Sequence, residues 1–430
     1  MSCPRRRSPC SISGWTGSFV KWDSEMRYVH SANRITRRIE GKADALVSIP
    51  KNFKMQIVGF FENLASERAI AARCADSLAI REFLHYALNE TTPDHSSLTV
   101  IRQRLGAEVF EQVFGLVLKA LQKHKLIKGN KLGIDASVME ANASLRSLQH
   151  RLTGEAYGEY VKQLAEASGV DSSDPAAVRR FDRTRPGRKT SNKEWQNPHD
   201  PDARVGRTKR GNTRMIYKPE HVVDLETGAI VDADVRPGDE HDTEELTQRI
   251  LAAEQRINHA LNEPKDNERI ELLAADMGYF KLEELWLLQQ LNIDTVIRDP
   301  HAGRRRDLLS ESDRAALCKA EQAVSSDIGK KLLRRRGELV ERSFEHVLDC
   351  GGARRTTLRG RQNIRKRYLI QAACANLSML MRHLAGVGTP KQALAAGRRV
   401  YEAIHALLRL LFGLKNPGYQ RFARYALAIG

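Results

Sequence analysis

The stretch RRRGELVERSFEHVLD, residues 334–349, has the hydrophobic spacing of an α-helix. Four residues form one apolar stripe along such a helix, as expected when one side is buried: Val340, Phe344, Val347 and Leu348. Three acids border that stripe at positions i, i+3 and i+7 of the helix: Glu338, Glu341 and Glu345. The stretch therefore predicts a helix that places Glu341 beside the protein core, in a strongly basic setting.

Two further acids each end a short apolar run. Asp135 closes KLGID, residues 131–135, and Asp276 closes LLAAD, residues 272–276. Runs of this length and composition are typical of short buried strands. A single Asp at a strand end is usually a turn or capping residue. The conjunction of two such acids with Glu341 leads to the hypothesis that the three converge to hold divalent metal ions for cutting and joining DNA.

Strands and helices are expected to alternate beyond residue 129, which predicts an α/β fold with a mixed sheet flanked by helices. A Glu-Thr-Gly turn separates the two strands of an expected hairpin. The expected strands are residues 131–137, 215–224, 229–235, 270–275 and 294–298, and the expected helices between the later ones are 244–259 and 281–291.

The region before the first strand has helical spacing, broken by the turn-rich sequence TTPDHSS at residues 91–97. This pattern fits a helix-turn-helix-like DNA-binding domain and a plain helical bundle equally well. The expected regions are a loose arm (1–42), a helical, possible DNA-binding domain (43–128), a catalytic core (129–144 and 213–385), a basic insertion (145–212) and a C-terminal helical segment (386–430).

The chain has a net charge of +17, and two segments hold the excess. Residues 179–218 and 330–367 each contain 13 basic and 4 acidic residues, so the rest of the chain is close to neutral. This concentration predicts a polyanionic partner, with nucleic acid the first candidate and an anionic membrane surface the second. Pro186, Gly187 and Pro198 predict an irregular surface loop in the first segment, in which Trp195 either stacks on a base or, as we prefer, anchors the loop.

Several classes of protein are disfavoured. No apolar run approaches the ~18–20 residues of a membrane-spanning helix, and the arginines near the start lack the apolar core of a signal peptide, so we expect a cytoplasmic protein. The six cysteines are scattered without Cys-x-x-Cys pairs, which indicates reduced thiols and no zinc site. An aromatic content of 6% and the positive charge argue against a glycosidase that uses paired carboxylates.

Seven fragments, in this order, resemble the DDE transposases of bacterial insertion sequences, in particular the branch around insertion sequence five and insertion sequence eleven-eighty-two. The resemblance runs from about residue 50 to residue 388. The fragments are SERAIA (66–71), PDHSSL (93–98), GIDASVMEAN (133–142), YKPEHVVDLETG (217–228), ADMGY (275–279), VERSF (340–344) and GGARRTTLRG (351–360).

This resemblance implies an RNase H-like catalytic core with Asp135 on the first strand, Asp276 at the end of the fourth and Glu341 on a following helix. These acids match the family's metal-binding Asp, Asp and Glu, and the implied cofactor is Mg²⁺, for which Mn²⁺ can substitute. The implied activity is metal-dependent cleavage at the terminal inverted repeats, followed by strand transfer into target DNA. Double-stranded DNA is the implied partner, bound by a homodimer or higher oligomer at the nucleoid.

The chain departs from the family pattern around Glu341. Relatives often place Tyr and Arg shortly before the Glu and Lys seven positions after it, whereas Gly337 and Leu348 occupy the nearest Arg and Lys positions here and no Tyr precedes. Other basic residues are expected to contact the DNA backbone instead. These candidates are Arg334, Arg335, Arg336, Arg354, Arg355, Arg359, Arg361, Lys366 and Arg367.

The remaining candidate residues have simpler interpretations. We interpret His221 as a strand residue and expect His241 to make local hydrogen bonds. The acids near the hairpin are interpreted as turn and surface residues: Asp232, Asp234 and Asp239. The alternative to an active transposase is a catalytically inactive DNA-binding protein derived from one, which intact acids disfavour.

Overall fold

The computed structural model describes residues 49–386 except 188–190, 209–210, 265–266, 268, 302–309 and 385. The expected N-terminal arm lies outside the described residues, as does the expected C-terminal segment from residue 387 onward. The chain divides into two compact units, residues 102–373 and a second formed by residues 1–101 with 374–430. Within the described residues, no helix has both the length and the apolar character needed to cross a membrane.

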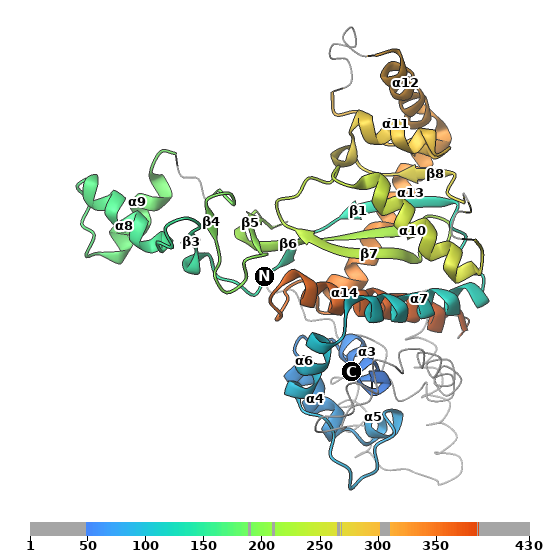
Figure 1. Ribbon diagram of the computed structural model, residues 1–430, viewed down its shortest axis with the longest axis horizontal. Coiled ribbons are helices and arrows are strands. Elements are labelled where there is room, and N and C mark those ends of the chain that lie inside the picture. The colour runs from blue at the N-terminus through green and yellow to red at the C-terminus, as the bar shows by residue number, and fades with distance from the viewer. Residues whose placement is uncertain are drawn as a thin grey trace, which may run out of the picture. The chain divides into compact units, whose positions relative to one another are not determined.

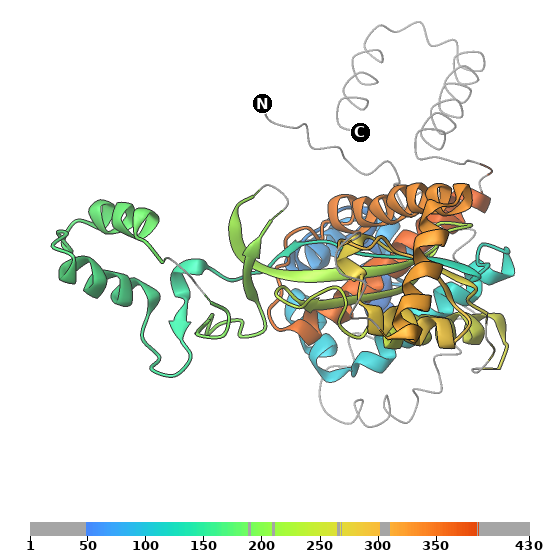
Figure 2. The same ribbon diagram turned by 90° about the horizontal axis from the view of Figure 1, so that it is seen from above.

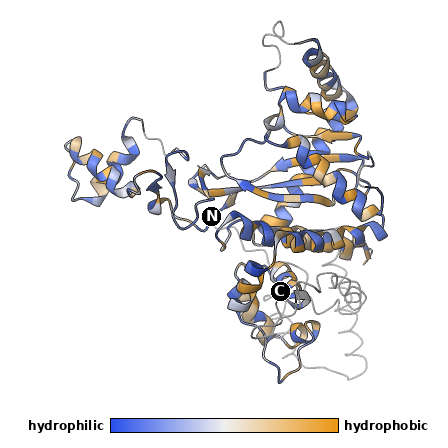
Figure 3. Ribbon diagram, in the orientation of Figure 1, coloured by the Kyte–Doolittle hydropathy of each residue, from blue (hydrophilic) through white to orange (hydrophobic). Residues whose placement is uncertain are grey.

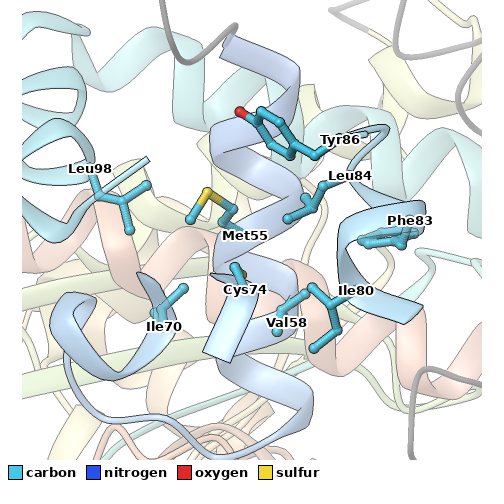
Figure 4. Packing of buried hydrophobic residues seen from close by; sticks show 9 residues of the cluster. All are labelled: Met55, Val58, Ile70, Cys74, Ile80, Phe83, Leu84, Tyr86 and Leu98. Atoms are coloured by element: carbon cyan, nitrogen blue, oxygen red, sulfur yellow. The ribbon is translucent and has the colours of Figure 1, made fainter. Parts of the chain in front are cut away.

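The described N-terminal part of the second unit is helical, as predicted. It contains α3 (Ile49–Phe61), α4 (Glu67–Asp76), α5 (Leu78–Phe83) and the start of α6 (His95–Arg104). The Ser66 and Ser77 hydroxyls cap α4 and α5 by accepting hydrogen bonds from backbone N–H groups three residues on. Figure 4 shows the buried cluster that these helices share: Met55, Val58, Ile70, Cys74, Ile80, Phe83, Leu84, Tyr86 and Leu98.

The larger unit is built on a mixed sheet with the spatial order β7-β6-β1-β8-β9. Strand β6 runs antiparallel to both β1 and β7, while β8 lies parallel to β1 and β9 lies parallel to β8. This order and these directions define an RNase H-like core, which confirms the predicted fold. The strands are β1 (Lys131–Ala136), β6 (Thr213–Asp224), β7 (Ile230–Pro237), β8 (Leu272–Ala274) and β9 (Asp294–Val296).

Helices cover both faces of this sheet, with α10 (Leu246–Leu261) in front and α13 (Asp327–Phe344) behind in Figure 1. Alternate residues of a strand point to opposite faces, and β6 shows the division directly. His221 contacts Ser343 of α13, whereas its neighbour Glu220 pairs with Arg249 of α10. Helix α13 packs across β9, β8, β1 and β6, so it spans the part of the sheet that carries the candidate acids.

Four further helices accompany the sheet in this unit. Helix α7 (Ala107–Lys123) packs on α10, and the residues from 102 onward belong to the unit of the sheet. We therefore assign α7 to the core and not to the helical region predicted for 43–128. Helix α14 (Arg361–Leu384) begins in this unit, and Figure 3 shows hydrophobic and hydrophilic residues alternating along α7 and α14. Helix α11 (Leu282–Gln290) packs on α12 (Glu311–Ser325), which covers β9.

The insertion between β1 and β6 contains more regular structure than its composition predicts. It includes β2 (Met139–Glu140), β3 (Gln149–His150), α8 (Tyr157–Ala167), α9 (Pro175–Thr184), β4 (Trp195–Gln196) and β5 (Arg204–Arg207). Figure 2 shows α8 and α9 as separate helices. The prediction of an irregular loop over 179–218 is wrong for α9, β4 and β5, because Asp174 caps α9 and β5 pairs with β6.

The Trp195 side chain explains part of this order. It is 4% exposed and its ring packs edge-on against Tyr157 and His150, with Tyr160 also in contact. Aromatic contacts of this geometry add to the stability gained by burial. Trp195 therefore anchors the insertion, as preferred from the sequence, and is not available to stack on a base.

Gly133 on β1 permits the close approach of α13. A Cβ atom at this position would lie 2.6 Å from Leu225 Cδ2 and 2.9 Å from Arg336 Cγ. We expect Gly133→Ala to lower the free energy of unfolding by about 1–3 kcal/mol in urea titrations, because overpacking forces the helix or its side chains to move.

Gly115 on α7 provides the matched control, since a Cβ atom there would meet nothing within 4 Å. Gly115→Ala should raise stability by up to about 1 kcal/mol through helix propensity. Equal effects of the two substitutions would contradict the packing of α13 on β1.

Candidate active site

Asp135 lies near the carboxyl end of β1, the central strand of the sheet. Its Oδ1 accepts a hydrogen bond from the Ala136 N–H at 2.8 Å, and its Oδ2 accepts one from Arg336 Nη1 at 2.6 Å. Burial raises the pKa of Asp135 to about 6; Arg336 opposes this shift, and the charge of Asp276 adds to it. Asp135 is thus a partly buried carboxylate beside another anion.

Asp276 follows β8, the parallel neighbour of β1. Gly133 is in register with Ala274, so Asp135 and Asp276 are each two residues further along adjacent strands. The Asp276 side chain caps the short 3₁₀ turn Met277–Tyr279, with Oδ1 accepting from the Gly278 N–H at 2.9 Å. The structure therefore brings together two of the three predicted metal-binding acids, at the carboxyl ends of adjacent parallel strands.

Glu341 lies on α13 as predicted, but its side chain is exposed and forms no hydrogen bond or ion pair with the described residues. The residue of α13 that reaches Asp135 is Arg336, whose side chain is 13% exposed. Within the described part of the chain, no three acidic, His or Cys residues stand close enough to hold one metal ion. The convergence of all three acids on metal thus stays a prediction.

A further acid, Asp242, stands at this site and was not singled out from the sequence. A Cβ atom built on Gly278 would lie 3.1 Å from both Asp242 Oδ2 and Asp276 Oδ1, so both oxygens border the same small space. The other oxygen, Asp242 Oδ1, lies 2.6 Å from Lys218 Nζ. The charge of Asp242 also helps to raise the pKa of Asp135. The available signal was GDEHD, residues 238–242, directly after the second hairpin strand.

His221 holds α13 and α14 against the sheet. Its ring is fully buried, lies 2.7 Å from both Ser343 Oγ and Tyr368 Oη through its two nitrogens, and stacks on Phe344 at 4.2 Å. Burial lowers the pKa of His221 to about 3, so the ring is neutral at ordinary pH. The interpretation of His221 as a strand residue is confirmed.

The structure contradicts the interpretation of two acids as surface residues. Both lie on β7 and form ion pairs with Arg249, the buried Asp232 at 3.4 Å and the half-buried Asp234 at 2.7 Å. Asp239 does fit that interpretation, since its exposed carboxylate pairs with Arg204 at 3.2 Å. The error arose because amino-acid composition does not distinguish an acid on the helix-covered face of a strand from an acid in the adjoining turn.

The basic residues proposed for DNA contact differ in their availability. Arg334 and Arg355 are exposed and form no hydrogen bond or ion pair with the described residues. Arg335 donates to the carbonyls of Leu225 and Glu226, and Arg359 to that of Asn142. Arg361 is half-buried. The two exposed, uncommitted arginines are the best placed to meet a phosphate.

Other members of that set are committed to protein contacts. Arg354 pairs with Asp349 and also donates to the Val138 carbonyl. Lys366 is 9% exposed and donates to the Arg102 and Leu105 carbonyls. Burial also lowers the pKa of Arg367 to about 10. Together with Arg336, these side chains support the fold, and the prediction that Lys366 contacts DNA does not fit its position.

Comparison with known proteins identifies the class. Residues 180–377 match the family described as Transposase DDE domain, and residues 40–104 match the family described as Transposase domain (DUF772). The two matches together span more than half of the chain, so the chain is a transposase. More narrowly, it belongs to the DDE transposases of insertion sequences, as its sequence fragments predicted. The first match contains Asp276 and Glu341 and begins after Asp135.

Two solved structures are similar in part. The Mos1 transposase paired-end complex with left transposon end is 11% identical, with 75% of this chain and 88% of that chain covered and a TM-score of 0.20. A pre-cleavage Mos1 transpososome is 12% identical, with coverage of 75% and 87% and the same TM-score. No match was found among curated protein sequences.

The buried His221 ring predicts a specific pH dependence of stability. Its pKa in the folded chain is below the value near 6.5 expected when unfolded, so the unfolded chain binds the proton first. The stability present above pH 6.5 is therefore lost as the pH falls toward 3. The free energy of unfolding should drop between pH 7.5 and pH 5 in both chains. We expect this drop to be about 2 kcal/mol smaller in His221→Gln than in the unmodified chain.

Urea titrations at the two pH values measure this difference. His241→Gln serves as the control because His241 is exposed, and it should lose as much stability as the unmodified chain. An unchanged pH dependence in His221→Gln would show that the ring is accessible to protons in the folded state.

Proposed function

We propose that this transposase binds the terminal inverted repeats of an insertion sequence and catalyses metal-dependent DNA cleavage and strand transfer. The observation that carries the proposal is the pair Asp135 and Asp276 at the ends of adjacent parallel strands, close enough for one charge to shift the pKa of the other. Paired carboxylates of this kind repel each other unless cations lie nearby. Such a pair suits a divalent cation better than it suits any neutral ligand.

The donor set fits Mg²⁺, with Mn²⁺ as a substitute. Mg²⁺ prefers hard oxygen ligands and keeps several waters, so a few carboxylates together with DNA phosphates suffice. Asp135, Asp276 and Glu341 would hold the ions. When bound, two such ions supply activation of the attacking oxygen and stabilisation of the leaving oxygen in phosphodiester chemistry.

The residues around these acids prepare them for that role. The Gly278 N–H fixes one oxygen of Asp276, and the Ala136 N–H fixes one oxygen of Asp135. Arg336 neutralises the second oxygen of Asp135 and would have to release it to a metal ion. Arg336 and Glu341 share α13 but lie about 140° apart around it. Bringing Glu341 to the acids while Arg336 leaves Asp135 would therefore require a rotation or shift of this helix. We propose that DNA binding drives this movement.

The exposed arginines support DNA as the partner. Arg334 lies on α13 and Arg355 follows it, so both are near Glu341 in the chain. We propose that they contact DNA phosphates, and that a homodimer or higher oligomer holds the two element ends. A wider positively charged surface would add the long-range attraction typical of DNA-binding enzymes.

A cleavage assay tests the role of Glu341. DNA carrying the inverted repeats that flank the reading frame is incubated with the full chain in Mg²⁺, Mn²⁺ or EDTA. We expect cleavage only with metal, and a loss of more than about 100-fold in Glu341→Gln, because removing a ligand costs at least as much as removing its supporting contacts. DNA binding measured by gel shift should be unchanged.

Glu338→Gln is the matched control, since Glu338 lies on the same helix and is exposed in a contact with Arg342. Its activity should stay within about two-fold, because exposed ion pairs contribute little. Full activity of Glu341→Gln would remove Glu341 from the mechanism. A complete absence of cleavage by the unmodified chain, with DNA binding retained, would instead favour an inactive DNA-binding protein derived from a transposase.

The salt dependence of DNA affinity tests the arginines. Each phosphate contact releases counterions, so the logarithm of the binding constant falls with the logarithm of salt concentration. We expect Arg355→Gln to reduce that slope by about 1. Lys319→Gln removes the same charge from an exposed pair with Asp294 on the far strand of the sheet, and should leave the slope unchanged. Equal slopes for Arg355→Gln and the unmodified chain would place Arg355 outside the DNA contact.

A further inference from the structure

Asp242 borders the candidate metal site, although it is not one of the family's three acids. It follows β7 in the loop before α10, so it comes from a different part of the chain than Asp135, Asp276 or Glu341. Its carboxylate nonetheless borders the same site, because its Oδ2 and Asp276 Oδ1 both face the space beside Gly278. Asp242 and Asp276 thus approach one place from two separate loops, beside the strand end that carries Asp135.

The two oxygens of Asp242 have different surroundings. Oδ1 lies 2.6 Å from Lys218 Nζ, and Lys218 also donates to the Glu240 carbonyl at 3.0 Å. Lys218 is therefore held by the same loop and fixes the orientation of the carboxylate. With Oδ1 bound in this way, Oδ2 is the oxygen presented toward Asp276.

The local structure also requires Gly278 at this position. A side chain there would contact both carboxylates, since its Cβ atom would lie 3.1 Å from an oxygen of each. The glycine thus keeps a side chain out from between Asp242 and Asp276. Two carboxylates that face one narrow space are the arrangement that a divalent cation stabilises.

We propose that Asp242 is a further carboxylate ligand of the divalent metal site formed by Asp135 and Asp276, with Lys218 as its positioning residue. The proposal rests on the metal-dependent function proposed above and adds a ligand to that site. Asp276 and Asp242 are the acids that hold an ion in the DNA-free chain, and Asp135, once Arg336 releases it, and Glu341 complete the set when α13 moves. Asp242 then binds metal before DNA is present, which Glu341 need not do.

Metal binding by the DNA-free chain tests the proposal without any activity measurement. Free Mn²⁺ is titrated by electron paramagnetic resonance against the full chain, Asp242→Asn, Asp276→Asn and Asp239→Asn. We expect Asp276→Asn and Asp242→Asn each to weaken Mn²⁺ binding by about 10- to 100-fold. Asp239→Asn removes the same charge from the same loop, where Asp239 pairs with Arg204, and should stay within about two-fold.

Salt separates a ligand from a distant charge. Exposed charges more than ~10 Å apart are screened at 0.1 M salt, so a purely long-range effect of Asp242→Asn should disappear at 0.5 M KCl. The loss expected from a missing ligand persists there. Circular dichroism in EDTA establishes that each variant is folded. If Asp242→Asn fails to fold, Asp242→Glu is measured instead. The Glu side chain keeps a negative charge beside Lys218 but displaces the carboxylate oxygens. It should weaken Mn²⁺ binding by at least about three-fold.

The outcomes are distinguishable. The proposal is overturned if Asp276→Asn binds Mn²⁺ weakly while Asp242→Asn, or Asp242→Glu where it replaces Asp242→Asn, binds with normal affinity. That result leaves the proposed function intact. A loss in Asp242→Asn that vanishes at 0.5 M KCl also overturns it. If the unmodified chain binds no Mn²⁺ in the absence of DNA, this proposal fails, whereas the metal-dependent function is decided separately by the cleavage assay in Mg²⁺ or EDTA.

Discussion

Repulsion between like charges is the constraint on which the candidate site depends. Asp135 and Asp276 are placed side by side by the parallel pairing of β1 and β8, and Asp242 lies close by. Bringing such groups together costs free energy unless cations or hydrogen-bond donors offset it. The chain supplies Arg336 to Asp135 and Lys218 to Asp242, while backbone N–H groups bind Asp135 and Asp276. Each of the two cations offsets part of this repulsion at the carboxylate that it contacts. In the proposed function a metal ion takes the place of Arg336 at Asp135, while Lys218 keeps its contact with Asp242.

A buried ionic network beneath the site holds these elements in position. Glu220 on β6 is 2% exposed and accepts from Arg236 at 3.2 Å, from Arg249 at 3.0 Å and from the Tyr279 hydroxyl at 2.9 Å. Tyr279 ends the short turn that Asp276 begins. Glu220 thus ties Asp276 to the hairpin and to α10. Networks of this kind add little net stability compared with apolar packing, but they are costly to break. Their role here is to fix geometry.

The sequence predicts the sheet well because each strand carries its own signal. The hairpin strands β6 and β7, the short apolar runs of β1 and β8, and helices α10 and α11 are found within a few residues of the predicted positions. Hydrophobic periodicity depends only on neighbours along the chain, so it can be read locally. The same argument fails for the insertion, where Trp195 orders a basic, proline-containing segment through contacts with Tyr157 and His150. Composition alone indicated a loop.

The site is harder to predict than the sheet, because its chemistry depends on contacts between distant residues. Asp135 and Arg336 are 201 positions apart, and no spacing rule links them. Asp242 was hidden for the same reason, since its neighbours His241 and Asp239 look equally suitable in the sequence. What distinguishes Asp242 is the space beside Gly278, which appears only when the loop after β7 and the turn after β8 are brought together. Catalytic acids that act as a group are therefore identified by the charges that surround them, and in this chain those charges come from Lys218 on β6 and Arg336 on α13.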